Sequence, residues 1–142
     1  MTTNNPKKAL TTFSDHEMDK YKAEAKQRWG NTEAYKQSVA RTKNWTKEDY
    51  KRIGEEGLAL TKQIALVMNL PVSDPKVQEL IKLHHDGIEV FYTCSMEMYR
   101  GLAEMYITDP RFAKYYEDIA PGLAKFVHDA ILHFCNTQEA SL

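Results

Sequence analysis

Apolar side chains recur at helical spacing along the chain, and this periodicity limits the fold more than any other feature. In the clearest run, between residues 77 and 105, a mostly apolar position returns every three or four residues. This run consists of Val77, Ile81, His84, Ile88, Phe91, Ser95, Met98, Leu102 and Met105. No segment alternates apolar and polar residues as a half-buried strand does. The pattern therefore predicts an all-α fold of about seven helices.

Capping residues and helix breakers divide this pattern into helices. Ser14 in "SDHE" and Thr46 in "TKED" each begin a capping box, in which a side chain and a free backbone amide are satisfied reciprocally. Gly30 is expected to close the first helix in a left-handed conformation. The helix after Thr46 is expected to reach about Asn69, because Pro71 cannot continue it.

The long apolar run must be interrupted. One helix from Ser73 to about Thr108 would be about 50 Å long, whereas a compact domain of this size has a radius of gyration of about 14 Å. "YTCS" at residues 92–95 is the expected break, since its residues are mediocre helix formers. "SDP" at Ser73 is expected to start the helix before it, Thr108 to cap a short helix after it, and Pro121 to start the last one.

Length and charge indicate a single domain without a nucleic-acid surface. The 142 residues suit one domain, in which polar residues 1–13 form a disordered arm or a cloning remnant and residues 14–142 form the folded unit. The formal net charge of −1 leaves no basic footprint, so we expect no direct contact with nucleic acid.

The cellular setting follows from what the chain lacks. Its start has no long apolar run, which predicts neither a signal peptide nor a spanning helix. Cys94 and Cys135 are too few for a disulfide framework. We therefore expect a cytoplasmic chain with reduced thiols and no membrane partner.

The sequence offers no specific catalytic or metal-binding motif. His84 and His85 are adjacent, so on a helix they point about 100° apart and cannot both face one metal ion. Glu89, Glu97 and Glu104 recur about two turns apart, as on a solvated helix face. Phosphate-binding loops and nucleophile elbows are absent from the sequence. We expect a protein that is not an enzyme and needs no metal or cofactor.

Aromatic and thioether side chains crowd into residues 91–106. They are Phe91, Tyr92, Met96, Met98, Tyr99, Met105 and Tyr106. Such a mixture suits a pocket for a bulky, mainly apolar ligand, and it also suits an ordinary core. The same two interpretations hold for Trp29 and Tyr35, which flank a helix junction in "RWGNTEAY".

Three segments, in this order and spacing, resemble the TipAS antibiotic-recognition domain. They are "YKAEAKQRWGNTEAYKQS", "EMYRGLAEMYITDPRF" and "PGLAKFVHDAI", and the resemblance covers about residues 14–134. That domain is the effector-binding end of a subgroup of MerR-type transcription regulators, and it also occurs as a stand-alone drug-sequestering protein. The resemblance implies a globin-like helical fold that binds macrocyclic thiopeptides or similar multidrug ligands without haem. It also implies that the N-terminal helices, roughly residues 14–70, are loose until they close over the ligand.

The resemblance implies a cleft between those N-terminal helices and the helices that carry Ile88 to Tyr106. We expect its wall to be formed by Trp29, Tyr35, His84, Ile88, Tyr92, Met96 and Tyr99, with Asp86 or Glu89 as polar contacts. Thiostrepton-type members carry a second cysteine seven residues after the position matching Cys94, and it captures ligand tails covalently. This chain has Gly101 there, so reversible binding is expected.

Two alternatives stay open at this point. One is a haem- or tetrapyrrole-binding globin-like sensor, for which His84, His128 or His133 could each serve as the proximal ligand. The other is an interaction domain that only packs against a partner and exposes an apolar patch to it.

Overall fold

The described part of the chain is helical. The computed structural model describes residues 23, 26–27 and 30–140, and this part contains helices and no strand. The all-α expectation is therefore confirmed. The arm expected at residues 1–13, and most of the helix expected after Ser14, lie outside the described residues.

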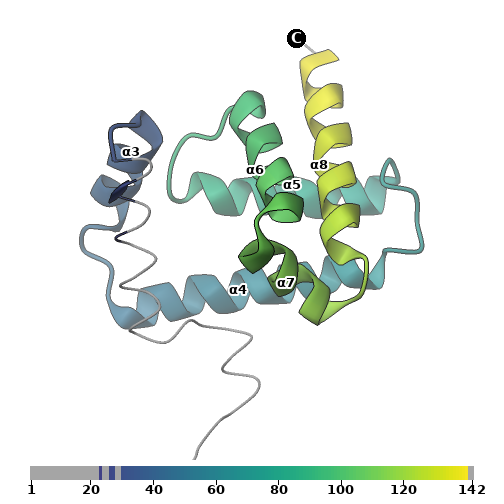
Figure 1. Cartoon of the computed structure of the whole chain (residues 1–142), viewed down its shortest axis with the longest axis horizontal. Helices are drawn as coiled ribbons and strands as arrows, with labels where there is room; N and C mark the ends of the chain where they lie inside the picture. The colour runs from purple at the N-terminus through teal and green to yellow at the C-terminus, as the bar shows by residue number, and fades with distance from the viewer. Residues whose placement is uncertain (1–22, 24–25, 28–29, 141–142) are drawn as a thin grey trace, which may run out of the picture.

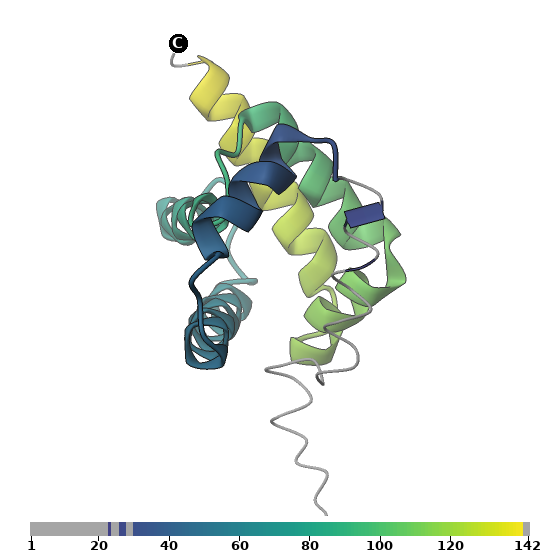
Figure 2. The same cartoon turned by 90° about the vertical axis from the view of Figure 1, so that its left-hand side faces the viewer.

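Six helices follow one another between residues 33 and 140 (Figure 1). They are α3 (Glu33–Thr42), α4 (Lys47–Leu66), α5 (Pro75–Glu89), α6 (Met96–Thr108), α7 (Pro110–Ile119) and α8 (Leu123–Ala140). Helices α4 and α5 run side by side and appear end-on in Figure 2, while α6 and α8 cross them steeply. Helix α3 lies at the end of the molecule remote from α8 (Figure 1).

The expected capping box at the start of α4 is confirmed. The Asp49 amide donates to Thr46 Oγ1 at 3.3 Å, and the Thr46 amide donates to Asp49 Oδ2 at 2.9 Å. The expected break after α5 is confirmed as well. Helix α5 ends at Glu89, and Ser95 caps α6 by accepting a hydrogen bond from the Met98 amide at 3.2 Å.

Two helix starts lie one residue later than expected. Asp74, rather than Ser73, caps α5, and Asp109, rather than Thr108, caps α7. In each case a proline follows the aspartate and occupies the first turn. The residue before a proline is held in an extended conformation, so it is the residue suited to the cap position.

The left-handed conformation expected at Gly30 is wrong. Among the described residues the glycine with positive φ is Gly122, at 85°. The Gly30 amide instead donates to the Lys26 carbonyl at 2.9 Å. A Cβ atom at Gly30 would lie 2.4 Å from that oxygen, so the position requires glycine because the backbone approaches closely.

The core lies between α4, α5, α6, α7 and α8, with Ile64 of α4 fully buried in it. Helix α8 supplies the largest share of it, through Leu123, Ala124, Val127, Ala130, Ile131, Phe134 and Cys135. Helix α3, by contrast, contains no buried residue. The outer helix is therefore positioned by contacts other than core packing, and these contacts lie beside the predicted site.

Candidate ligand-binding site

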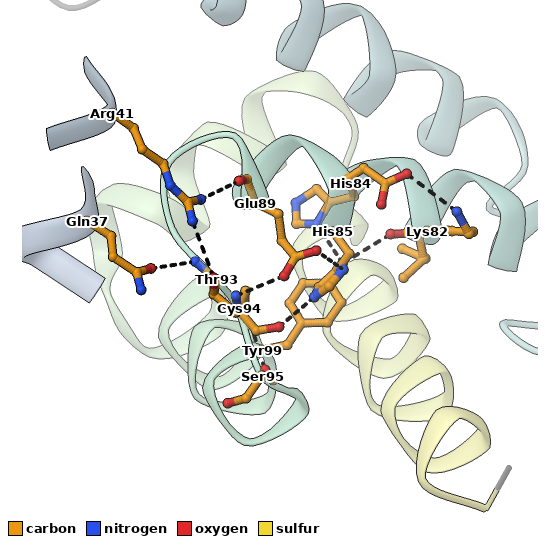
Figure 3. A network of polar contacts seen from close by, with 12 residues as sticks. Gln37, Arg41, Lys82, His84, His85, Glu89, Thr93, Cys94, Ser95 and Tyr99 are labelled. Atoms are coloured by element: carbon orange, nitrogen blue, oxygen red, sulfur yellow. Dashed lines mark hydrogen bonds and ion pairs between the residues drawn. The ribbon is translucent and has the colours of Figure 1, made fainter. Parts of the chain in front are cut away.

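Helix α3 is attached to the segment that joins α5 to α6. Arg41 donates to the Glu89 carbonyl at 2.8 Å and to Thr93 Oγ1 at 3.3 Å, while the Thr93 amide donates to Gln37 Oε1 at 2.8 Å (Figure 3). Gln37 and Arg41 are four residues apart and so share one face of α3. These hydrogen bonds are exposed, so the helix is held by contacts with which water can compete.

An aromatic contact joins the α3–α4 connection to the same segment. The ring of Trp45 lies 5.3 Å from that of Phe91 and 5.1 Å from that of Tyr50, between ring centroids. These separations are typical of favourable aromatic pairs. Residues 90–95 therefore receive both polar and apolar contacts from the N-terminal part of the described chain.

The last turns of α5 hold residues 90–95 from the other side. Glu89 Oε2 accepts from the Cys94 amide at 3.1 Å, and His85 Nε2 lies 2.8 Å from the Cys94 carbonyl (Figure 3). Because a carbonyl can only accept, His85 Nε2 carries the hydrogen. Both polar groups of the Cys94 main chain are thus satisfied by α5, which fixes the segment that α3 contacts.

His84 lies within a hydrogen-bonded group of tyrosines. Its Nδ1 is 2.7 Å from the Tyr99 hydroxyl, which donates to the Ile81 carbonyl at 3.3 Å. Its Nε2 faces the Tyr116 hydroxyl at 3.5 Å, so each nitrogen of the ring lies beside a tyrosine hydroxyl. Burial, with a smaller contribution from His85, lowers the pKa of His84 to about 4. His84 is therefore a neutral, hydrogen-bonded histidine at neutral pH.

Tyr99 and Tyr106, two of the aromatics in residues 91–106, pack against aromatic rings of other helices. Tyr99 is 0% exposed, and its ring stacks on His84 with 5.7 Å between centroids. Tyr106 is buried against Tyr116 at 5.1 Å and near Phe112 at 5.9 Å. Burial is the main cause that raises the pKa of Tyr99 and of Tyr116. This group is part of the core in the described structure.

The expected site residues are distributed over three helices and one connection. Helix α5 carries His84, Asp86, Ile88 and Glu89, helix α6 carries Met96 and Tyr99, helix α3 carries Tyr35, and Tyr92 lies between α5 and α6. Asp86 is exposed, Tyr99 is buried, and the others are partly buried. Trp29 lies outside the described residues. A shallow groove on the outer face of α5, lined by Lys76, Glu79, Leu80, Lys82 and Leu83, contains none of them.

Four residues that sequence reasoning missed connect these helices: Gln37, Arg41, His85 and Thr93. The four-residue spacing of Gln37 and Arg41 was a usable signal that they share a face. Their partners, 48 to 56 residues further along the chain, left no local signal.

Cys94, which lies among the expected site residues, is buried. Cys94 is 2% exposed, and burial first, then Glu89 and Cys135, raise the pKa of its thiol to about 11. The thiolate is the nucleophilic form, so Cys94 is a poor nucleophile at neutral pH. Gly101 is exposed on α6 and offers no side chain for capture.

The geometry disfavours two of the three histidines considered for haem. His84 contacts hydroxyls through both ring nitrogens, and His128 contacts carboxylates through both of its own. Neither presents an unoccupied nitrogen to an iron.

Among the described helices, none combines the length and apolarity needed to cross a bilayer.

Comparison with known proteins identifies the family. The sequence model of the TipAS antibiotic-recognition domain matches residues 21–134. The HTH-type transcriptional activator TipA of Streptomyces coelicolor is 38% identical over 130 residues, covering 89% of this chain and 51% of that protein. The HTH-type transcriptional activator mta of Bacillus subtilis is 29% identical over 132 residues, covering 92% and 51%.

The described fold also matches a solved structure. Nosiheptide in complex with TipAS, from a thiopeptide antibiotic multidrug resistance system of Streptomyces lividans, has a TM-score of 0.80, 35% identity and 97% coverage of both chains. This chain spans about half the length of the curated relatives it matches, and those relatives are transcription regulators. The chain belongs to the family of TipAS antibiotic-recognition domains.

Proposed function

We propose that this chain recognises bulky, peptide-like antibiotics of the thiopeptide class or similar multidrug effectors, and that it binds them reversibly. The observation that carries this proposal is the end-to-end likeness to the nosiheptide complex, with a TM-score of 0.80 and 35% identity over 97% of both chains. That relative was solved with nosiheptide bound and shares the helical framework of this chain, so a similar ligand class is the simplest function for this one.

The chain would act by binding and not by catalysis. Its curated relatives are transcription activators of about twice the matched length, so it serves either as the effector domain of a MerR-type regulator or as a stand-alone drug-sequestering protein. Either role is cytoplasmic, needs no cofactor, and assigns any DNA contact to a separate domain. We take residues 14–142 as the binding unit.

The proposed site lies where α3 faces residues 90–95 and the adjoining turns of α5 and α6. Its wall would comprise Trp29, Tyr35, His84, Ile88, Tyr92 and Met96, with Asp86 or Glu89 as polar contacts, and the buried Tyr99 would support this wall from behind. Two properties of α3 support this position. It has no buried residue, and its hydrogen bonds to residues 89–93 are exposed, so a ligand can displace or reposition it at modest cost.

Titration of the purified chain with nosiheptide and with thiostrepton tests the proposal. Calorimetry should give saturable binding, and circular dichroism should record a gain in helical content if the N-terminal helices close over the ligand. Tyr35→Ala should weaken binding, whereas Leu66→Ala, at a position 80% exposed on α4, should leave it unchanged. Absence of saturable binding of either thiopeptide would overturn the proposal, and a Soret band formed with added haemin would favour the globin-like sensor.

A further inference from the structure

Three side chains near the end of α5 converge. His85, Asp86 and Glu89 each offer a ligand atom, and these atoms all lie within 4.8 Å of one another. Residues 85 and 89 are one helical turn apart and share a face. Asp86 starts about 100° around the helix from His85, but its carboxylate turns back, so that its oxygen lies within 4.8 Å of the other two ligand atoms. Among the residues that the structure describes, these three form the group of histidine, cysteine or carboxylate side chains whose ligand atoms are close enough to share a metal ion.

The His85 ring is held in one orientation. The residue is 9% exposed, and its Nε2 donates to the Cys94 carbonyl at 2.8 Å. Metal-binding histidines commonly donate their second N–H to a backbone carbonyl, because this fixes both the tautomer and the direction of the free nitrogen. The donation leaves Nδ1 directed at the Glu89 carboxylate (Figure 3).

That nitrogen has no hydrogen bond within the described part of the chain. Its distance to Glu89 Oε1 is 3.8 Å, which is too long for one. Nδ1 thus faces the Glu89 carboxylate without a hydrogen bond, and the second carboxylate, Asp86, stands nearby. Lys82 approaches Asp86 at 3.6 Å, but both side chains are more than half exposed, so this pair is weak. The convergence of electron-rich groups would be relieved by a cation between them.

The distance between His85 Nδ1 and Glu89 Oε1 suits such an ion. Zinc lies about 2.1 Å from nitrogen and oxygen ligands, so two bonds span at most about 4.2 Å, and 3.8 Å fits within this limit. Asp86, whose side chain is 52% exposed, can rotate to supply the third ligand. Glu89 can coordinate through Oε1 while Oε2 keeps its hydrogen bond from the Cys94 amide.

We propose that His85 Nδ1, Glu89 and Asp86 form a binding site for a divalent transition-metal ion of the zinc type, with water completing the coordination. One imidazole and two carboxylates favour zinc, cobalt or nickel over calcium, which prefers oxygen ligands alone. The proposal concerns the ligand-free chain and does not rest on antibiotic recognition, although Asp86 and Glu89 are also proposed polar contacts for the antibiotic.

A second histidine provides the matched control. His128 also lies between two carboxylates, but Nε2 is 2.9 Å from Glu104 and Nδ1 is 2.8 Å from Asp129. Both nitrogens are therefore engaged, and no lone pair is left for an ion. Glu104→Gln removes a carboxylate beside a histidine, as Glu89→Gln does, at a place where no metal should bind.

The test titrates tag-free protein with cobalt(II) and zinc(II) chloride, by cobalt absorption and by calorimetry. The wild-type chain should bind one equivalent, and Asp86→Asn and Glu89→Gln should each weaken binding by more than the ~10–100-fold that loss of an outer-shell partner costs. Glu104→Gln should bind as the wild type does. The glutamine at position 89 retains an oxygen acceptor for the Cys94 amide, and circular dichroism checks that each variant is folded.

Three results would overturn the site. They are no saturable binding to the folded wild-type chain, equal binding by the Asp86→Asn and Glu89→Gln variants, or an equal loss in Glu104→Gln. A failure of metal binding together with intact thiopeptide binding rejects the metal site alone. Intact metal binding without thiopeptide binding rejects only the antibiotic-recognition function.

Discussion

Two histidines respond to their surroundings in opposite ways. Burial first, and then His85, lower the pKa of His84 to about 4. Partial burial alone would lower the pKa of His128 too, but hydrogen bonds to Glu104 and Asp129 outweigh it and raise that pKa above the usual value. The sign of each contribution to stability follows from linkage between protonation and folding.

The two contributions fall in different pH ranges. The unfolded-state pKa of a histidine is about 6.5. The neutral form of His84 stabilises the fold above this pH, and the stabilisation is lost as the pH falls towards about 4. The charged form of His128 stabilises the fold below about pH 6.5, and this is lost as the pH rises through the raised folded-state pKa. From these two groups, stability should be greatest near pH 6.5.

Replacement of Glu104 by glutamine isolates the His128 contribution. Glu104→Gln removes the carboxylate on Nε2, so the pKa of His128 should fall, as ring NMR titration can measure. In urea unfolding, the difference in free energy from the wild type should be largest below about pH 6.5 and shrink at higher pH. Glu97→Gln makes the same charge change on α6 without a histidine partner, and its effect should not vary with pH in this range. A pH-independent effect of Glu104→Gln would contradict the linkage.

At the scale of the helix, alanine substitutions at Gly122 and Gly101 should change stability in opposite directions. Gly122 precedes α8 with φ of 85°, where its amide donates to Glu117 at 2.9 Å, whereas Gly101 is exposed within α6. Gly122→Ala should cost about 1–2 kcal/mol, because L residues are strained at positive φ. Space is not the cause, since the added Cβ would meet Met68 at an ordinary 3.6 Å.

Gly101→Ala is the matched substitution and should have the opposite sign. A Cβ at Gly101 meets nothing within 4 Å, so alanine should stabilise the helix by up to about 1 kcal/mol. Urea unfolding of both variants measures the two effects under the same conditions. Equal effects at the two positions would mean that backbone conformation does not govern them.

Arg41 should control how firmly α3 is attached. Arg41→Ala removes the hydrogen bonds to the Glu89 carbonyl and Thr93, a loss of about 1 kcal/mol, so amides of α3 should exchange about fivefold faster. The control variant Arg52→Ala also removes a positive charge, but the salt-bridge partners of Arg52 lie in α4 itself. Hydrogen exchange in α3 should therefore be unchanged in that variant. Faster exchange throughout α8 in Arg41→Ala would contradict a local role for Arg41.

Local signals explain which helix ends could be predicted. The capping box at Thr46 and the break at residues 92–95 depend on neighbouring residues and were both predicted correctly. The caps at Asp74 and Asp109 lie one residue beyond the predicted Ser73 and Thr108, because the following proline holds each aspartate in the extended conformation of a cap residue. Gly30 was misread because glycine also serves close backbone approach, which the sequence does not distinguish from a left-handed turn.

The site was less predictable than the helices because its contacts are not local. Aromatic crowding around residues 91–106 could not separate core from pocket, and the structure assigns Tyr99 and Tyr106 to the core. The attachment of α3 joins residues about 50 positions apart in sequence, for example Arg41 to Glu89. Periodicity reports which face of a helix is apolar, and it carries no information on which distant backbone group that helix will meet.

The whole molecule divides into a packed part and an attached part. Helices α4 to α8 share the aromatic and aliphatic core, whereas α3 contributes no buried residue and, among the described residues, is held by hydrogen bonds to residues 89–93. Regions with few buried contacts and exposed hydrogen bonds open at lower free energy than the core. Such a division suits a receptor that reorganises one end around a ligand while the rest keeps its structure.

This division makes a prediction that distinguishes closure from binding to a preformed site. Nosiheptide at about 100 times its dissociation constant should stabilise the fold by about 2.7 kcal/mol, whichever mechanism holds. If residues 14–70 also order against the ligand, unfolding exposes more surface, so the dependence of the unfolding free energy on urea should become steeper. Urea unfolding with and without nosiheptide measures both quantities at once. A higher midpoint with an unchanged slope would contradict closure while leaving antibiotic recognition intact, because the ligand would then occupy a site that the free chain already presents.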